Sequence, residues 1–161
     1  MALESARLAG LEVPQEALDL ARGFLQGAWD DELGAFRYNH APSRLSTEYK
    51  TLPASTPAAM FALSLLGEDL SKDSYGPARM FLLTRAPDGY RFDGERAFVE
   101  HATGNLYFWY YSSLALLRAG GKAWTTWNQA LKATLLPAQQ SDGSWQPISI
   151  YAQYAGDSDL D

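Results

Sequence analysis

Two stretches of this chain carry no charged residue and are largely apolar on every face that a helix would present. They are residues 55–66 and residues 104–117. A helix that is apolar on all sides is normally surrounded by other protein. We therefore predict buried helices at 55–66 and 104–119, and we expect Gly120 to end the second one, because glycine is favoured where a helix stops.

Three other segments have the pattern of amphipathic helices, at 14–28, 72–84 and 121–136. In each of them apolar residues recur every three or four positions, and charged or other polar residues occupy the opposite face. A short helical segment at 1–9 precedes them. The sequence therefore predicts an outer layer of amphipathic helices that covers the apolar ones.

The order of these segments repeats along the chain. Residues 21–25 and 78–82 share the pattern Ala-Arg-x-Phe-Leu, and each follows its own glycine, Gly10 or Gly67, at the same distance. The chain reads as three imperfect copies of one helix pair. Buried helices placed side by side inside amphipathic ones predict an all-α fold of the α/α-toroid type. The alternative is a plain helical bundle whose aromatic residues only fill the core.

The third copy closes with an aromatic turn that contains Gln139, Asp142, Gly143 and Trp145. We expect Gln139 to bond the carbonyl groups left unpaired at the end of the preceding helix. Asp142 and Gly143 are typical turn residues. Trp145 is expected to pack back over the last helix pair as an aromatic staple.

Together with the aromatic run at 107–111 and the tryptophans Trp124 and Trp127, this turn resembles a known type of repeat. It is similar to the repeats of the prenyltransferase and squalene oxidase superfamily, including its squalene cyclases, and in particular to bacterial prenyltransferase-repeat proteins. The resemblance implies an α/α-toroid. A full toroid of that superfamily has about twice as many helices. We therefore expect residues 1–161 to be a single repeat domain, an arc of about three helix pairs from a longer protein.

Composition narrows the function classes. The net charge is −6 and the pI is about 4.8, so the chain has no basic block that could neutralise nucleic-acid phosphates. It has no cysteine, which excludes disulfides and thiolate sites and leaves the cellular compartment open. The uncharged stretches are shorter than the roughly 20 apolar residues of a membrane-spanning helix, so no membrane span is predicted.

In a toroid the inner helices are parallel, and their N-termini open at one mouth. These ends carry partial positive charge and unpaired N–H groups, which suits an anion such as a diphosphate. The segments that enter the inner helices supply the candidate ligand-binding residues. They are Glu48, Tyr49, Glu100, His101, Asn105, Tyr107 and Tyr110, and Asp157, Asp159 and Asp161 would lie at the same mouth.

No complete catalytic motif is present. The acid of squalene cyclases has the pattern Asp-x-Asp-Asp, and Leu160 occupies its last position here. The zinc site of protein prenyltransferases needs a cysteine. The two histidines, His40 and His101, are too far apart in sequence for a local zinc motif. No catalytic residue, metal site or cofactor is therefore assigned.

Three functions remain open. We favour a binding or scaffold module that is not catalytic by itself, with a hydrophobic or isoprenoid-like small molecule as its ligand. Its other partners would be the remainder of a parent protein or a second copy, bound where the ends of the arc expose apolar surface. The alternatives are part of a terpenoid cyclase or prenyltransferase-like enzyme, and a carbohydrate-active α/α-barrel protein that uses Tyr107, Trp109 and Tyr110 as sugar platforms.

Overall fold

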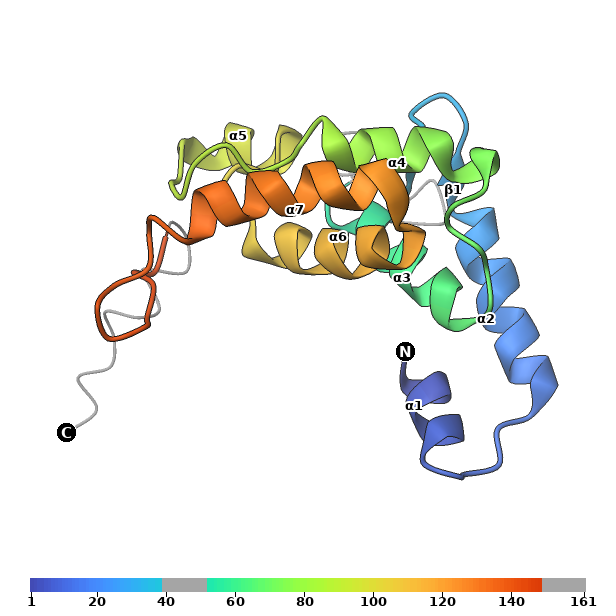
Figure 1. Ribbon diagram of the computed structural model, residues 1–161. Coiled ribbons are helices and arrows are strands. Elements are labelled where there is room, and N and C mark those ends of the chain that lie inside the picture. The colour runs from blue at the N-terminus through green and yellow to red at the C-terminus, as the bar shows by residue number, and fades with distance from the viewer. Residues whose placement is uncertain (39–51, 149–161) are drawn as a thin grey trace.

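The computed structural model describes residues 1–38 and 52–148, and within them the chain is mostly helical (Figure 1). The helices are α1 (Ala2–Leu8), α2 (Gln15–Gly27), α3 (Ser55–Leu65), α4 (Gly76–Leu83), α5 (Gly94–Glu100), α6 (Leu106–Ala119) and α7 (Gly121–Leu135), with a short 3-10 helix, η2 (Asp73–Tyr75), leading into α4. The strands are β1 (Trp29–Asp30) and β2 (Ala35–Phe36). Every helix predicted from the sequence is confirmed, whereas α5 and the two-stranded sheet were not predicted.

The helices form two layers. α3 packs along α6, and α4 and α7 lie against them and contact each other. The helices predicted to form pairs, α3 with α4 and α6 with α7, are therefore in contact. Seen from the side in Figure 1, the described chain is arched, with α1 and α2 at one end and the aromatic turn after α7 at the other.

The contact between α6 and α7 is part of the hydrophobic core. Trp127 of α7 is completely buried, and its ring meets Phe108 of α6 edge-on at a centroid distance of 6.0 Å. Its indole Nε1 donates a hydrogen bond to Ser113 Oγ at 2.9 Å. Both the apolar body and the polar atom of Trp127 are thus satisfied by α6, which fixes the outer helix on the inner one.

A short hairpin follows α2 and packs against α3 and α4. Trp29 and Phe36 are directly opposite each other in the antiparallel pair β1–β2, with their rings 5.0 Å apart. The backbone N–H of buried Phe36 donates to Thr56 Oγ1 in the first turn of α3 at 3.0 Å. Trp29 and Phe36 thus hold the turn between the two strands as a cross-strand aromatic pair.

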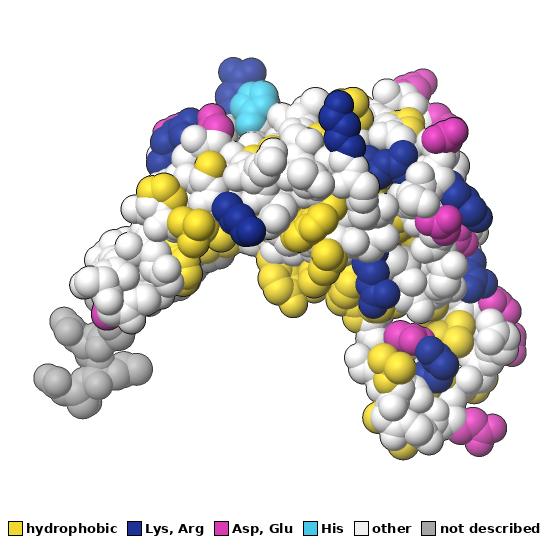
Figure 2. Space-filling model, viewed as in Figure 1, with side chains coloured by type: hydrophobic (Ala, Val, Ile, Leu, Met, Phe, Trp, Pro, Cys, Tyr) yellow, Lys and Arg dark blue, Asp and Glu magenta, His cyan; other side chains and the backbone are white. Residues whose placement is uncertain are grey.

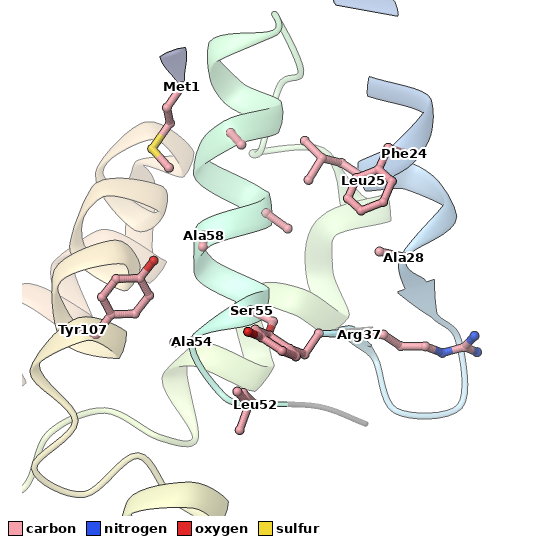
Figure 3. Close-up of a pocket in the computed structure, with 13 residues that line it drawn as sticks. Met1, Phe24, Leu25, Ala28, Arg37, Leu52, Ala54, Ser55, Ala58 and Tyr107 are labelled. Carbon is pink, nitrogen blue, oxygen red and sulfur yellow. The ribbon is translucent and has the colours of Figure 1, made fainter. Parts of the chain in front are cut away.

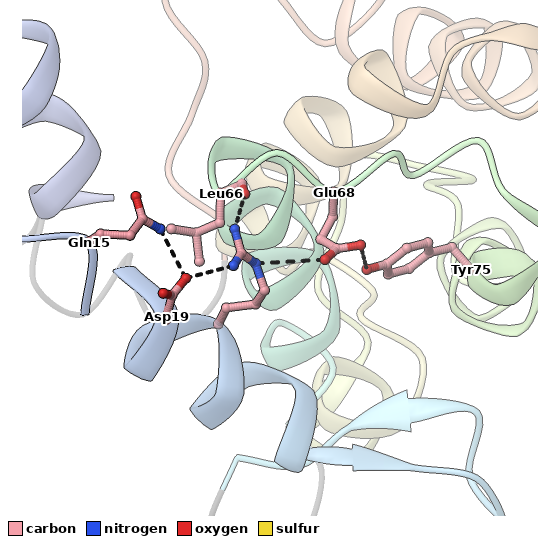
Figure 4. Close-up of polar contacts among 6 residues, drawn as sticks. Gln15, Asp19, Leu66, Glu68 and Tyr75 are labelled. Carbon is pink, nitrogen blue, oxygen red and sulfur yellow. Dashed lines mark hydrogen bonds and ion pairs between the residues drawn. The ribbon is translucent and has the colours of Figure 1, made fainter. Parts of the chain in front are cut away.

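Arg22 of α2 ties the first helix pair to the end of α3 (Figure 4). Its guanidinium donates to the Leu66 carbonyl at 2.6 Å and to Asp19 Oδ1 at 3.0 Å. It also lies 3.8 Å from a carboxylate oxygen of Glu68, whose other oxygen accepts a hydrogen bond from the Tyr75 hydroxyl at 3.3 Å. This chain of contacts joins α2, the end of α3 and η2.

Tyr75 should make the protein sensitive to alkali. Burial, followed by the charge of Glu68, raises the pKa of Tyr75 to about 12. An unfolded tyrosine ionises near pH 10, so the stability from neutral Tyr75 is complete below about pH 10 and is lost as the pH rises toward 12. After allowance for solvent screening we expect a loss of about 1 kcal/mol. Urea melts at pH 8 and pH 11 should show that Tyr75→Phe has a smaller loss than wild type; equal losses would contradict this account.

α3 and α6 differ in burial although both lack charge. No residue of α3 is exposed, as predicted. The prediction that residues 104–119 are buried on every side is wrong, because Tyr107, Tyr110 and Leu117 are 53%, 62% and 55% exposed. They share one face of α6, opposite the face that packs on α3 and α7, and no described element covers it. The expectation that apolar surface is exposed beside this helix is therefore confirmed.

Candidate functional site

Only some of the residues predicted at the mouth lie within the described ranges. Glu48 and Tyr49, like His40 and the three aspartates after residue 156, lie outside the described residues. Glu100 and His101 end α5 and are exposed. The Glu100 carboxylate accepts from Arg96 at 3.1 Å and lies 3.9 Å from His101 Nε2. Within 1–38 and 52–148, no hydrogen bond or ion pair joins this pair to Tyr107 or Tyr110.

Asn105 caps α6. It is buried, and its Oδ1 accepts a hydrogen bond from the Phe108 backbone N–H at 2.9 Å. This is the geometry of a helix N-cap, in which the side chain pairs one of the otherwise unpaired N–H groups of the first turn. The residue that was predicted as a ligand contact therefore has a clear local role in positioning the inner helix.

The tyrosines of α6 form one aromatic cluster. The Tyr111 ring lies 4.7 Å from that of Tyr107, 5.1 Å from that of Tyr110 and 6.3 Å from that of Phe61 on α3. Burial, followed by a hydrogen bond with Tyr107, raises the pKa of the Tyr111 hydroxyl. Trp109, which was predicted as a sugar platform, is buried and cannot offer its face to a ligand.

The aromatic turn is built differently from the prediction in one respect. The Trp145 indole Nε1 donates to the Leu135 carbonyl at the end of α7 at 2.8 Å, whereas Gln139 Nε2 donates to the Gly143 carbonyl at 2.9 Å and closes the turn itself. Asp142 Oδ1 accepts the backbone N–H two residues further on. Trp145 is 39% exposed, so it caps the helix rather than packing as a buried staple.

A cavity of about 400 Å³ lies between α1, α2, α3 and the first turn of α6 (Figure 3). Its floor is a stripe of small side chains on α3, formed by Ala58, Ala59 and Ala62. Phe24 and Leu25 of α2 line it from the other side, and Met1 and Tyr107 line its edge. The alanines are close together on α3. Their side chains are short, and the large side chains of α2 that face them do not fill the space between the two helices.

The polar groups of the cavity are few. Arg37 lines it with its aliphatic stem, and Figure 3 shows the guanidinium extending away from the cavity. That guanidinium bonds Asp30 Oδ2 at 2.8 Å, and this hydrogen bond is the largest cause that lowers the Asp30 pKa. Ser55 also lines the cavity. Its Oγ is buried and has no hydrogen-bond partner within the described part of the chain.

The size and the lining of this cavity suit the binding of an apolar molecule. The cavity falls within the range of about 300–1,000 Å³ that is typical of small-molecule sites, and it is lined mainly by apolar side chains with a few polar groups. Residues 1–38 and 52–148 hold no cluster of His, Asp and Glu side chains that could bind a metal ion. No helix in these ranges has both the length and the hydropathy needed to cross a bilayer.

Sequence reasoning missed this cavity. It placed the ligand site at the mouth of the inner helices, and of the residues named there that lie within the described ranges, only Tyr107 lines the cavity. The available signal was the set of alanines at 58, 59 and 62, which leaves a shallow stripe on a helix that is otherwise bulky.

Comparison with models of protein families, with curated proteins and with solved structures gives no match to this chain.

Proposed function

We propose that this chain is a repeat domain of the prenyltransferase and squalene oxidase kind, an arc of an α/α-toroid, and that it binds a hydrophobic or isoprenoid-like small molecule without being catalytic by itself. The apolar cavity between α2 and α3 carries this proposal. The alternation of inner and outer helices and the aromatic turn after α7 support the toroid assignment.

The cavity lies on the inner layer, where α3 and α6 meet. Figure 2 shows hydrophobic side chains gathered along the hollow underside of the arch, away from most of the charged groups. Tyr107 belongs both to the cavity lining and to the exposed face of α6. A ligand in the cavity would therefore contact the inner helices and remove apolar surface of both from water, which is the main source of affinity for such a molecule.

The test is a binding measurement with a cavity-filling variant. Farnesol should displace the neutral dye Nile red from the wild-type chain. Ala62→Trp should weaken binding of both at least tenfold, because the indole occupies the space over the alanine stripe. The matched control is Ala133→Trp, which adds the same side chain at an exposed position of α7.

Circular dichroism melts should show that both variants fold. If Ala62→Trp is unfolded, the smaller Ala58→Leu replaces it, since Ala58 lines the same floor. Binding that is equally strong in wild type, the cavity variant and the control would contradict the proposal, and so would the absence of binding to the wild-type chain.

A further inference from the structure

Ser55 is a polar residue of the cavity lining. It begins α3, and its hydroxyl oxygen is shielded from solvent without a hydrogen-bond partner within the described part of the chain. A buried hydroxyl without a partner is unfavourable, so native structures nearly always pair such groups. Ser55 lines the cavity, but its Oγ has almost no accessible surface in this rotamer, so rotation about the Cα–Cβ bond must bring the hydroxyl into the cavity before a ligand can supply the missing partner.

The cavity offers little to a negative charge. Its lining cation, Arg37, bonds Asp30 at 2.8 Å and points away from the space. In the first turn of α3, the N–H groups of Ser55 and Ala58 already donate to backbone carbonyls, and Pro57 has no N–H. The net charge of −6 adds a general repulsion of anions. Burial of an unpaired anion is costly, so these features select against one.

We infer that the cavity binds an uncharged amphiphile, an apolar molecule with one hydroxyl or carbonyl oxygen, and that Ser55 Oγ makes the hydrogen bond to that oxygen. The apolar body lies over Ala58 and Ala62, between Phe24 and Tyr107. This inference rests on the proposed function, and it differs from the expectation, made for the mouth of the toroid, of an anion such as a diphosphate.

Retinol and retinoic acid test the inference, because they share one apolar body and differ in a hydroxyl against a carboxylate. Both are titrated by displacement of Nile red at pH 8, where the acid is ionised. Wild type should bind retinol at least tenfold more tightly than retinoic acid. Ser55→Ala should weaken retinol binding about three- to tenfold, the usual contribution of one hydrogen bond. Ser64→Ala is the matched control on the same helix, since Ser64 Oγ bonds the Phe61 carbonyl and does not line the cavity.

The ligand-free melting temperature gives an independent readout. Because the Ser55 hydroxyl has no partner in the described ranges, Ser55→Ala should not lower it. A lower melting temperature would show that the hydroxyl is already bonded within the chain and would overturn the inference. So would equal binding of the two retinoids, or retinol binding unaffected by Ser55→Ala.

The two proposals fail in different ways. If neither retinol nor farnesol binds the wild-type chain, the proposed function fails and the inference fails with it. If retinol binds and Ala62→Trp blocks it, while Ser55→Ala or the carboxylate makes no difference, only the inference about the polar group fails.

Discussion

Replacing Trp127 with alanine should lower the free energy of unfolding by about 3–5 kcal/mol, the usual cost of removing a large aromatic side chain from a core. The ring is completely buried between α7 and α6, edge-on to Phe108. The same change leaves the Ser113 hydroxyl without its indole donor. Urea denaturation followed by circular dichroism measures the difference, as a shift of the midpoint at constant slope.

Trp145→Ala is the control for this variant. It removes the same side chain from a position that is 39% exposed, where the indole contributes one hydrogen bond to the Leu135 carbonyl. We expect a loss of about 1 kcal/mol. If the two alanine variants cost the same free energy, Trp127 does not have the special place in the core that its burial indicates.

Gly104→Ala should cost about 2–4 kcal/mol. Gly104 has φ +70°, a left-handed conformation that costs other residues about 1–2 kcal/mol. An added Cβ would also lie 2.5 Å from the Arg91 carbonyl oxygen, so the loop at 90–93 or the start of α6 must move. Overpacking of this kind typically costs a further 1–3 kcal/mol. Urea denaturation gives the size of the effect.

A second glycine separates the two causes of this loss. Gly143 has φ +88°, but the nearest atom to its added Cβ is Gln139 Nε2 at 3.9 Å, which is an ordinary contact. Gly143→Ala should therefore show the backbone cost alone, about 1 kcal/mol. An equal loss for the two variants would mean that the close approach of Gly104 to Arg91 does not contribute.

Hydrophobic pattern predicted the helices well and burial less well. α3 and α6 have the same signal, a charge-free and largely apolar helix, yet only α3 is enclosed. The reason is that a pattern records what a helix can bury, whereas burial depends on how many neighbours it has. α3 lies between α2, α4 and α6. The exposed face of α6, by contrast, has no neighbour in the described part of the chain.

The hydrophobic pattern did not predict the short elements or the cavity. α5 has only seven residues, too few to show a helical period, and the strands have two residues each. The cavity depends on where α2 packs on α3, and this is set by long-range contacts such as that of Arg22 with the Leu66 carbonyl. The N-cap role of Asn105 was not predicted either, because it depends on the residue at which α6 begins.

Tyr107 connects two surfaces that would otherwise be independent. Its side chain lines the cavity, and it is also part of the exposed apolar face of α6, in contact with Tyr111. Any molecule that covers that face and reorients Tyr107 changes the shape of the cavity. By thermodynamic reciprocity, a cavity ligand then changes the affinity of the covering molecule by the same factor. One tyrosine is enough to make the two binding equilibria cooperative. The cooperativity is positive if the cavity ligand and the covering molecule favour the same rotamer of Tyr107, and negative if they favour different ones.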